Sequence, residues 1–312
     1  MAKAIVTGGA GFIGSHLAEE LARRGYHVVI LDDLSTGKME NIKGLLDRGI
    51  VTFVQGSITE LPLLQKLFDN VDYVFHQAAL ARVLFSVQNP LAVNEVNVTG
   101  TLNVLLAARD SGVKKVICAS SAAVYGDTLT LPHKEEMVPN PQSPYAVTKL
   151  VAEYYCQVFQ VVYGLPTVAL RYFNVYGPKQ DPGSEYAAVI PRFIKRASDG
   201  KSLIIFGDGE QTRDFVFVGD VVLANISAAE TGATGVFNIG QGRGVTISEL
   251  AKVIIHIMDK DVAIIHQGPR VGDIRHSLAD ISKAKLFTYE PQYDLEAGLT
   301  ETIGNPRQWS RK

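Results

Sequence analysis

The chain has 312 residues, enough for one large domain or two moderate ones with a sizeable core. Apolar residues make up 46% and charged residues 20%, and a net charge of −2 gives no indication of a nucleic-acid partner. No apolar run approaches the roughly 20 residues that a membrane helix needs, so we expect a cytoplasmic protein without a membrane partner. Cys118 and Cys156 lack metal-ligand spacing and are expected to be buried free thiols, so no metal is predicted.

The first 32 residues predict a strand, a helix and a second strand. The segments AIVT and HVVIL are short and apolar, and GSHLAEELARRG between them has apolar residues at helical spacing. Gly8, Gly11 and Gly14 precede the helix, at a spacing that lets a pyrophosphate approach backbone N–H groups at the helix N-terminus. Asp32 ends the second strand, where a carboxylate accepts hydrogen bonds from an adenosine ribose and repels a 2′-phosphate. We therefore predict NAD, rather than NADP, as the cofactor.

Strands and helices continue to alternate through the first half of the chain. The segments VTFVQG, VDYVFHQAA and KKVICASS indicate strands, and PLLQKLFD and NEVNVTGTLNVLLAARDSG indicate helices. This order predicts an α/β protein with a Rossmann-type, doubly wound parallel sheet and helices on both faces. Ligands bind such sheets at the carboxyl ends of the strands. The glycine-rich turn, Asp32 and residues 78–81 and 120–125 are therefore expected along one edge.

The segment SPYAVTKLVAEYY predicts a helix that carries a Tyr–Lys pair. Ser143 suits the N-cap and Pro144 suits the first helical position. Tyr145 and Lys149 are four residues apart, so both project from one helix face, where an ammonium favours a phenolate able to carry protons. The alternative is an amphipathic helix in which the tyrosine is half buried and the lysine is solvated.

Ser121 ends a predicted strand at the edge where the ligand is expected. Its hydroxyl can bond a sugar oxygen and relay a proton to Tyr145, or it can simply cap a turn. The chain has no Gly-x-Ser-x-Gly elbow, so hydrolysis through a serine nucleophile is not expected. The cofactor and the chemistry are thus expected to share one edge of the sheet.

Taken together, these motifs resemble those of one known family. TGGAGFIG, Asp32, HQAA, NVTGT, SSAAVYG, SPYAVTK and RYFNVYGP, in this order, are similar to the extended short-chain dehydrogenase/reductase family. In the second half, KQDPGSEYAAVIPRF and RVGDIRHSLADISKAK resemble UDP-N-acetylglucosamine 4-epimerases. The resemblance implies NAD-dependent inversion at C4 of a UDP-sugar through a transient 4-keto sugar. It also implies a homodimer built from the helices at NVTGT and YAVTK.

The resemblance also implies roles for individual residues. Ser121, Tyr145 and Lys149 match the catalytic hydroxyl, the base and the cofactor-anchoring lysine. The residues expected to contact NAD are Gly8, Gly11, Phe12, Ile13, Gly14, Asp32, Asp33, Ser35, Thr36, Gly37, Ser57, Ile58, Gln77, Ala78, Ala79, Asn97, Ala119, Tyr145, Lys149 and Tyr172. Those expected to contact the UDP-sugar are Ser121, Ala122, Tyr145, Asn174, Ala188, Val189, Phe206, Arg213, Arg270, Asp273 and Ser277.

Several positions bear on the choice of sugar. Ser277 stands where a bulky tyrosine in the family excludes an N-acetyl group, so the serine leaves more room. Ala81 replaces a lysine of glucose-type epimerases, which fits the N-acetyl subgroup, and Ser57 replaces an aspartate that bonds the adenine in many relatives. Ala122 and Ala123 stand where that subgroup can have further serines and where sugar dehydratases carry an Asp–Glu pair, so dehydration is not expected.

Two alternatives use the same scaffold. One is a 4-epimerase of UDP-uronic acids, for which Arg82 or Arg275 is a candidate partner of the carboxylate. The other is a nucleotide-sugar reductase or decarboxylase. A redox-sensing regulator is disfavoured because such proteins lose the Tyr–Lys pair. We expect residues 1–173 with about 215–241 to bind NAD, and about 174–214 with 242–312 to bind the UDP-sugar.

Overall fold

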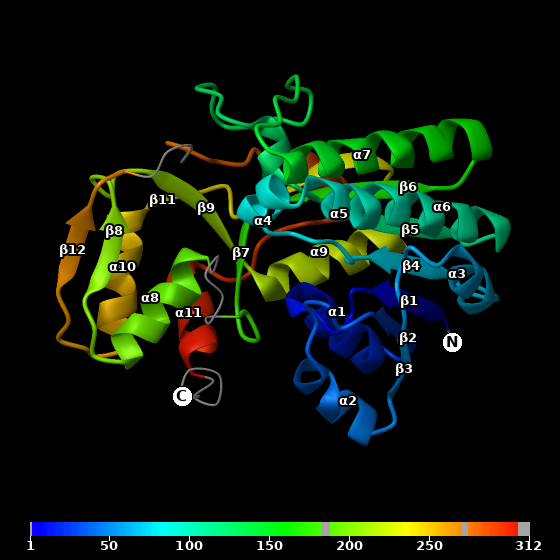
Figure 1. The fold of residues 1–312 in the computed structure, drawn as a ribbon, viewed down its shortest axis with the longest axis horizontal. Helices are drawn as coiled ribbons and strands as arrows, with labels where there is room; N and C mark the ends of the chain where they lie inside the picture. Colours follow the sequence, from blue (N-terminus) through cyan, green and yellow to red (C-terminus); the bar gives the residue numbers. More distant parts are fainter. Residues whose placement is uncertain (1, 182–187, 270–273, 305–312) are drawn as a thin grey trace.

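The computed structural model of the chain describes residues 2–181, 188–269 and 274–304. A seven-stranded sheet runs through the larger part of the molecule, and a smaller lobe lies beside it (Figure 1). All neighbouring strands of the large sheet are parallel. In spatial order they are β10 (Gly235–Ile239), β6 (Thr167–Tyr172), β5 (Lys115–Ser121), β4 (Tyr73–His76), β1 (Lys3–Thr7), β2 (His27–Asp32) and β3 (Val51–Gln55).

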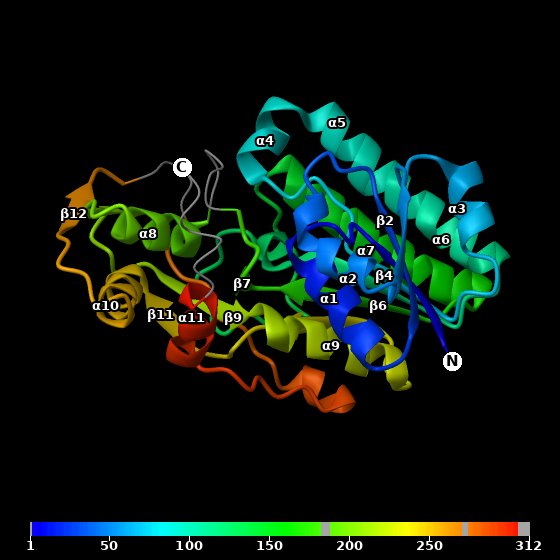
Figure 2. The ribbon, with the colours of Figure 1, turned by 90° about the horizontal axis from the view of Figure 1, so that it is seen from below.

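Helices cover both faces of the large sheet (Figure 2). One apolar core packs this sheet against α1 (Phe12–Arg23), α2 (Lys43–Asp47) and α9 (Val218–Glu230). A second core, on the opposite face, packs it against α3 (Leu61–Leu67), α6 (Gly100–Asp110) and α7 (Pro144–Tyr163). The predicted doubly wound parallel sheet is therefore confirmed.

Helix α7 begins where the sequence predicts. Ser143 is the N-cap, and its Oγ accepts a hydrogen bond from the N–H of Ala146 at 3.2 Å. Pro144 occupies the first helical position, where its missing N–H costs nothing. The helix ends at Gly164, whose φ of 69° is left-handed and favours glycine.

A long helical segment, residues 90–110, precedes β5. It consists of α5 (Pro90–Asn94), a π-helical turn (Glu95–Thr99) and α6, and the short α4 (Val83–Gln88) comes before it. Its length and mean hydropathy of 1.2 would allow it to cross a membrane, but 50% of this window is buried inside the protein. That burial is typical of a helix packed on a sheet. The sequence pattern did not predict the π-helical turn.

The smaller lobe is built from two separate segments of the chain. One of its sheets has the order β11-β9-β7, and a second consists of the parallel strands β8 and β12. Its elements are β7 (Asn174–Tyr176), α8 (Val189–Ser198), β8 (Leu203–Phe206), β9 (Thr212–Phe217), β11 (Gly244–Thr246), α10 (Ile247–Ile257), β12 (Ile264–Gln267) and α11 (Leu295–Ile303).

The segment 215–241, expected to return to the large sheet, divides between the two lobes. Helix α9 packs on the large sheet and β10 pairs with β6. Strand β9 instead pairs with β7 and β11 in the smaller lobe. The apolar pattern of DFVF suits a buried strand in either sheet, so the sequence did not distinguish them. We propose the two-domain division with β9 in the smaller lobe.

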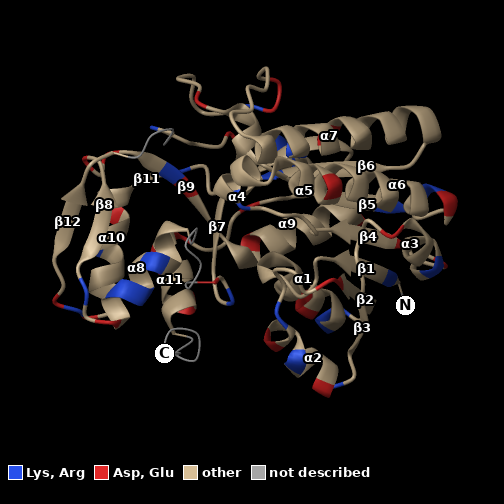
Figure 3. Ribbon diagram, viewed as in Figure 1, with Lys and Arg blue, Asp and Glu red and all other residues tan. Residues whose placement is uncertain are grey.

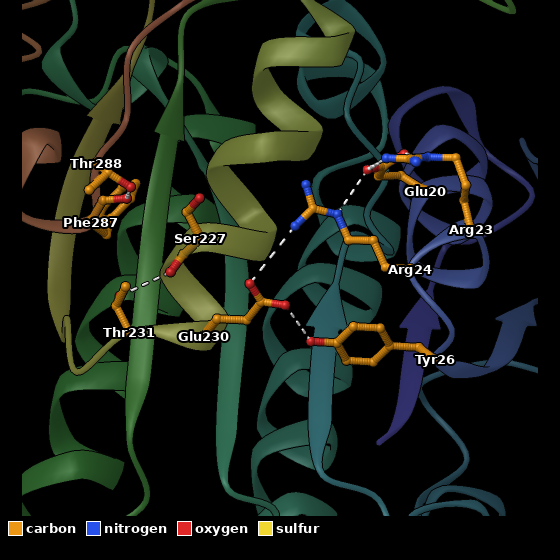
Figure 4. Close-up of polar contacts among 9 residues, drawn as sticks. All are labelled: Glu20, Arg23, Arg24, Tyr26, Ser227, Glu230, Thr231, Phe287 and Thr288. Carbon is orange, nitrogen blue, oxygen red and sulfur yellow. Dashed lines mark hydrogen bonds and ion pairs between the residues drawn. The ribbon is translucent and has the colours of Figure 1, made fainter. Parts of the chain in front are cut away.

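A surface network joins the ends of α1 and α9 (Figure 4). The Tyr26 hydroxyl donates to Glu230 at 2.7 Å, and Arg24 lies 3.9 Å from the same carboxylate. Arg24 also contacts Glu20 of α1 at 2.8 Å. Because these groups are exposed to solvent, each pair contributes at most about 1 kcal/mol to stability.

A buried lysine at the amino end of β5 caps the C-terminus of α9. Lys115, the first residue of β5, is 5% exposed. Its ammonium donates to the carbonyls of Ala228, Thr231 and Ala233 at 3.0, 2.5 and 2.9 Å. A helix C-terminus presents unpaired carbonyls and partial negative charge, which this ammonium satisfies. Lys115 lies at the amino end of β5, on the opposite edge of the sheet from Ser121.

His76 and His16 both have a pKa that lies well below the ordinary value of histidine. His76 ends β4, where its Nδ1 lies 2.8 Å from Thr7 Oγ1 and its Nε2 lies 2.9 Å from Thr101 Oγ1. Burial, followed by the charge of Lys149, lowers the pKa of His76 to about 3. His16 of α1 lies 2.9 Å from the Pro178 carbonyl, and burial is the main cause that lowers its pKa to about 4. Both rings take up a proton on unfolding below their ordinary pKa of about 6.5.

We predict that His76→Gln weakens the dependence of stability on pH. A histidine whose folded pKa is lowered stabilises the fold above its unfolded pKa, and this stability is lost as pH falls toward the folded pKa. Between pH 6 and 4 the wild-type free energy of unfolding should therefore fall by about 1.4 kcal/mol more per pH unit than that of the variant. Urea unfolding at pH 4.5, 5, 5.5 and 6 measures both slopes, and equal slopes would contradict the assignment.

Candidate active site

The carboxyl edge of the large sheet borders a cavity of about 300 Å³. Its walls come from the glycine-rich turn, the ends of β2, β4, β5 and β6, and the first turns of α7. Of the residues expected to contact NAD, all except Gly37 and Asn97 line it. Leu31, Gly56 and Val96 also line it and were not predicted, whereas Leu80, Ala81 and Ser120 were expected at this edge of the sheet but not as cofactor contacts.

The glycine-rich turn is packed so closely that side chains would not fit. Gly8 has a φ of +67°, and a Cβ on it would lie 2.7 Å from the backbone N of Ala78. A Cβ on Gly14 would collide with the carbonyl oxygen of Gly8. The first N–H groups of α1 have no carbonyl of their own helix to bond. The residues that carry them, Phe12, Ile13 and Gly14, line the cavity, and such a helix N-terminus suits a pyrophosphate, which fits NAD.

Asp32 stands at the end of β2, where the cavity would receive a ribose. It is 7% exposed, and its two oxygens accept the N–H groups of Ala10 and Leu34 at 2.9 and 2.8 Å. Burial raises the pKa of Asp32, and these two donors oppose the shift. A Cβ on Gly37 would lie 2.5 Å from Asp32 Oδ1, so this glycine allows a close approach to the carboxylate rather than lining the cavity.

Tyr145 and Lys149 lie together on the cavity wall. Both are buried, and the Lys149 Nζ lies 5.9 Å from the centroid of the Tyr145 ring. The lysine ammonium donates to the carbonyl of Ala119 on β5 at 2.8 Å. This geometry departs from the alternative of a solvated lysine on an amphipathic helix. It puts a fixed positive charge beside a phenol at the edge of the cofactor cavity.

Ser121 borders a second cavity, of about 180 Å³. Its Oγ accepts the N–H of Ala123 at 3.1 Å, so it caps the 3₁₀ turn Ala122–Tyr125 as the structural alternative predicts, and it also lines this cavity. Tyr172 lines both this cavity and the larger one, so the two are neighbours. Ser121 lines one of them and the Tyr–Lys pair lines the other, and we call the region where the two cavities adjoin the passage.

A third cavity, of about 230 Å³, continues into the smaller lobe. It shares Asn174 and Arg213 with the second cavity. Of the other expected substrate contacts, Ser121, Ala122 and Ser277 line the second cavity, and Ala188, Val189 and Phe206 line the third. Arg270 and Asp273 lie outside the described residues. Through these shared residues the three cavities adjoin in series, and we call this series a path from the glycine-rich turn to the smaller lobe.

The third cavity also contains polar residues that the sequence reasoning missed. Arg192 of α8 places its guanidinium 5.5 Å from the centroid of the Phe206 ring. Gln211 donates from Nε2 to the carbonyl of Phe206 at 2.8 Å. Arg192 follows Val189 by three residues and so shares its helix face, a spacing that would have indicated it. No local pattern pointed to Gln211, which comes from a different segment.

Asn97, an expected cofactor contact, lies behind the cavity wall. It belongs to the π-helical turn, and its Oδ1 accepts the N–H of Leu80 at 2.8 Å. Its Nδ2 donates to the Leu80 carbonyl at 3.2 Å and to Thr148 Oγ1 at 3.0 Å. Leu80 lines the cavity, so Asn97 shapes the wall through the backbone. Such π-helical turns often occur at functional sites.

Asn225 of α9 supports the opposite wall, and the sequence did not reveal it. It is fully buried, and its Nδ2 donates to the Tyr172 hydroxyl at 2.8 Å. Gln77 Nε2 donates to Asn225 Oδ1 at 3.1 Å. Tyr172 and Gln77 both line the cofactor cavity. Asn225, although distant in sequence, thus holds Tyr172 and Gln77 in place in this wall.

Comparison with known proteins agrees with this geometry. Residues 4–240 match the NAD dependent epimerase/dehydratase family. A putative UDP-glucose 4-epimerase of Methanocaldococcus jannaschii is 41% identical over 301 residues, which cover 96% of each chain. A UDP-N-acetyl-alpha-D-glucosaminuronate decarboxylase of Bacillus cytotoxicus is 37% identical over 324 residues, covering 99% of this chain and 98% of that protein.

A solved structure is similar over nearly the whole chain. It is a UDP-N-acetylglucosamine 4-epimerase from Methanobrevibacter ruminantium M1, in complex with UDP-N-acetylmuramic acid. The identity is 43%, the TM-score is 0.94, and the similarity covers 97% of each chain. The predicted family, fold and NAD cofactor are therefore confirmed. This chain belongs to the NAD dependent epimerase/dehydratase family of the extended short-chain dehydrogenase/reductases.

Proposed function

We propose that the protein interconverts the C4 epimers of a UDP-hexose, with UDP-N-acetylglucosamine and UDP-N-acetylgalactosamine as the preferred pair. UDP-glucose and UDP-galactose are expected as further substrates. The observation that carries the proposal is the path of three cavities, with Ser121 and the Tyr145–Lys149 pair beside the passage between the first two. In this path NAD occupies the first cavity, the hexose the second and the UDP the third.

The side chains of the passage suit proton transfer at the sugar. Tyr145 takes the proton of the 4-hydroxyl, and Ser121 bonds the same oxygen or relays the proton. The Lys149 ammonium, fixed by the Ala119 carbonyl, stabilises negative charge that develops on the phenol oxygen. When bound, NAD would supply reversible hydride transfer at C4, so that a transient 4-keto sugar could take the hydride back on its other face and C4 would be inverted without net oxidation.

The second cavity supports an N-acetylated sugar because its walls carry short side chains. Ala122, Ala123, Gly126 and Ser277 all line it. Ser277 is buried, so it is part of the wall rather than a surface residue. The Asn174 amide and the Arg213 guanidinium stand where this cavity meets the third one, and a guanidinium is well suited to diphosphate oxygens.

UDP-uronic acids, the substrates of the main alternatives, are less well supported. Arg275 forms a two-bond fork with Asp208, at 2.8 Å for each bond, outside the three cavities. Arg82 lies 4.0 Å from Asp181 and lines none of the three. Neither arginine is therefore placed to bind a sugar carboxylate. A nucleotide-sugar reductase or decarboxylase remains the second candidate. A reductase would need added NADH, and a decarboxylase would release carbon dioxide.

We also propose a homodimer that forms through α7 and the neighbouring helices α5 and α6. These helices lie side by side (Figure 1). The two charged residues of α7, Lys149 and Glu153, are both buried, so its outer face is uncharged (Figure 3). The outer face instead exposes Val147, Tyr154, Val158 and Val161 in one stripe, and α5 exposes Leu91. A second copy would cover this apolar surface.

We keep the expectation of a cytoplasmic location, which suits two free, buried cysteines.

Replacement of Tyr145 by Phe should abolish turnover and leave NAD bound. Loss of the proton carrier is expected to lower kcat by about 10²- to 10⁴-fold, while the ring still packs in the wall. Epimer interconversion followed by NMR gives kcat, and the absorbance of released dinucleotide gives NAD content. Tyr163→Phe, at the far end of the same helix, is the control and should match wild type. Full activity in Tyr145→Phe would refute the assignment.

Replacement of Ser277 by Tyr should change the choice of sugar. A bulky ring in the second cavity is expected to lower kcat/KM for UDP-N-acetylglucosamine at least tenfold relative to UDP-glucose, a difference of about 1.4 kcal/mol. The ratio of the two values, measured on one preparation, is independent of any loss of active enzyme. An unchanged ratio would show that Ser277 does not select the sugar.

The double change Val158→Glu and Val161→Glu should yield a monomer. Two carboxylates on the proposed interface would lose their hydration in a dimer, which is costly. Light scattering after size-exclusion chromatography reports the mass of each variant. Leu129→Glu is the control, since Leu129 is also exposed and belongs to none of these helices. A wild-type monomer, or a double variant that remains dimeric, would contradict this interface.

A further inference from the structure

A buried ion pair lies behind the passage between the first two cavities. Arg171 of β6 forms a two-bond fork with Glu153 of α7, with Nε 2.8 Å from Oε1 and Nη2 2.7 Å from Oε2. Both side chains are 3% exposed. The hydroxyl of Ser120 on β5 donates a further hydrogen bond to Oε1 of the same carboxylate. One carboxylate thus joins a helix to two strands of the large sheet.

The two strand residues of this cluster each adjoin a residue of the passage. Ser120 directly precedes Ser121, which lines the second cavity. Arg171 directly precedes Tyr172, which lines both the first and the second cavity. Neighbouring residues of a strand are joined through the backbone. A shift of Ser120 therefore also moves Ser121, and a shift of Arg171 also moves Tyr172.

The helix residue of the cluster is aligned with the Tyr–Lys pair. Glu153 follows Lys149 by four residues and Tyr145 by eight, so the three lie on one face of α7. Lys149 bonds the carbonyl of Ala119, and Glu153 bonds the hydroxyl of the next residue along β5. The position of α7 along β5 is therefore set by two polar contacts, one helical turn apart.

The rest of this interface is mostly apolar, apart from the hydrogen bond that Thr167 Oγ1 of β6 donates to the Cys156 carbonyl at 2.8 Å, so directional contacts near the site are few. Below Glu153, the inner face of α7 packs Ala152, Cys156 and Phe159 against the sheet. Apolar packing is non-directional, whereas an arginine–carboxylate fork has a fixed geometry. Stability alone does not explain the ions, since well-packed apolar residues often replace a buried ion pair without loss of stability.

The same arginine supports the wall of the second cavity. Its guanidinium lies 4.7 Å from the centroid of the Tyr125 ring, at the end of the 3₁₀ turn that Ser121 caps. The Tyr125 hydroxyl donates to Asn238 on β10 at 2.7 Å. The next residue, Gly126, lines the second cavity. Arg171 is thus packed between α7, which carries Tyr145, and the 3₁₀ turn that Ser121 caps.

We propose that Glu153, Arg171 and Ser120 are positioning residues for the reaction. Their fork and hydrogen bond hold α7 in register with β5 and β6, so that the Tyr145 phenol, the Lys149 ammonium and the Ser121 hydroxyl keep one mutual placement. This inference rests on the proposed epimerase activity. A misplacement of about 1 Å at reacting groups can cost about a hundredfold in rate.

The test compares three variants as holoenzymes with NAD bound. Glu153→Leu/Arg171→Met removes both charges together and leaves no buried ion unpaired. Arg171→Lys keeps the positive charge and removes the fork. Lys115→Met is the matched control, because it also deletes a buried cation with several hydrogen bonds, at the opposite edge of the sheet. For each variant kcat and KM for UDP-N-acetylglucosamine, bound NAD and Tm are measured.

A positioning role predicts a fall in kcat of ten- to a hundredfold in the double variant and in Arg171→Lys. KM should stay within about threefold and NAD content should be unchanged, because the anchors of both ligands remain. Lys115→Met should lower Tm and leave kcat unchanged. A double variant with wild-type kcat would overturn the inference, and if that variant does not fold, wild-type kcat in Arg171→Lys overturns it. A wild-type protein that converts no UDP-hexose would instead overturn the proposed function, and this inference with it.

Discussion

The hydrogen bond from the Lys149 ammonium to the Ala119 carbonyl is the contact on which the site depends. It fixes a positive charge at the carboxyl end of β5, one helical turn from Tyr145 and two residues from Ser121. Without it, the lysine side chain would have no fixed position beside the phenol. The parallel sheet makes this contact possible, because the carboxyl ends of its strands all lie at one edge, and α7 begins at that edge.

The two lobes contribute differently to the proposed reaction. The large sheet provides a rigid first cavity, whose walls are fixed by the packed glycine turn and by buried polar residues such as Asp32 and Asn225. The smaller lobe provides the third cavity, with Arg192 and Gln211 among its polar residues. Between them, five of the ten residues that line the second cavity are Ala, Gly or Ser. A sugar held mainly through its nucleotide can turn there, which inversion at C4 requires.

Local patterns predicted much of this arrangement. Apolar spacing located the strands and helices of the first half, and Ser143 and Pro144 marked the start of α7. Asp32 was found because the carboxyl edge of a parallel sheet is a known ligand site, whereas Tyr172 was expected only from the family resemblance. These features depend on residues close together in the chain, where spacing alone determines which groups share a face.

Features that depend on distant partners could not be predicted in this way. No pattern in the sequence indicated that Glu153 pairs with Arg171, that Asn225 accepts a hydrogen bond from Gln77, or that β9 joins the smaller lobe. Each depends on which segments meet in space, and the apolar pattern of a buried strand is the same in either sheet. Asn97 was assigned to the cofactor, yet its amide bonds the backbone of Leu80 behind the wall.

The most direct test of the account follows the hydrogen at C4. UDP-N-acetylglucosamine with deuterium at C4 should be incubated with the purified protein in ordinary water, without added NADH, and the products resolved by NMR. Hydride transfer to enzyme-bound NAD and back predicts UDP-N-acetylgalactosamine that retains the deuterium at C4. Product that has exchanged this deuterium for solvent hydrogen, or no 4-epimer at all, would contradict the account.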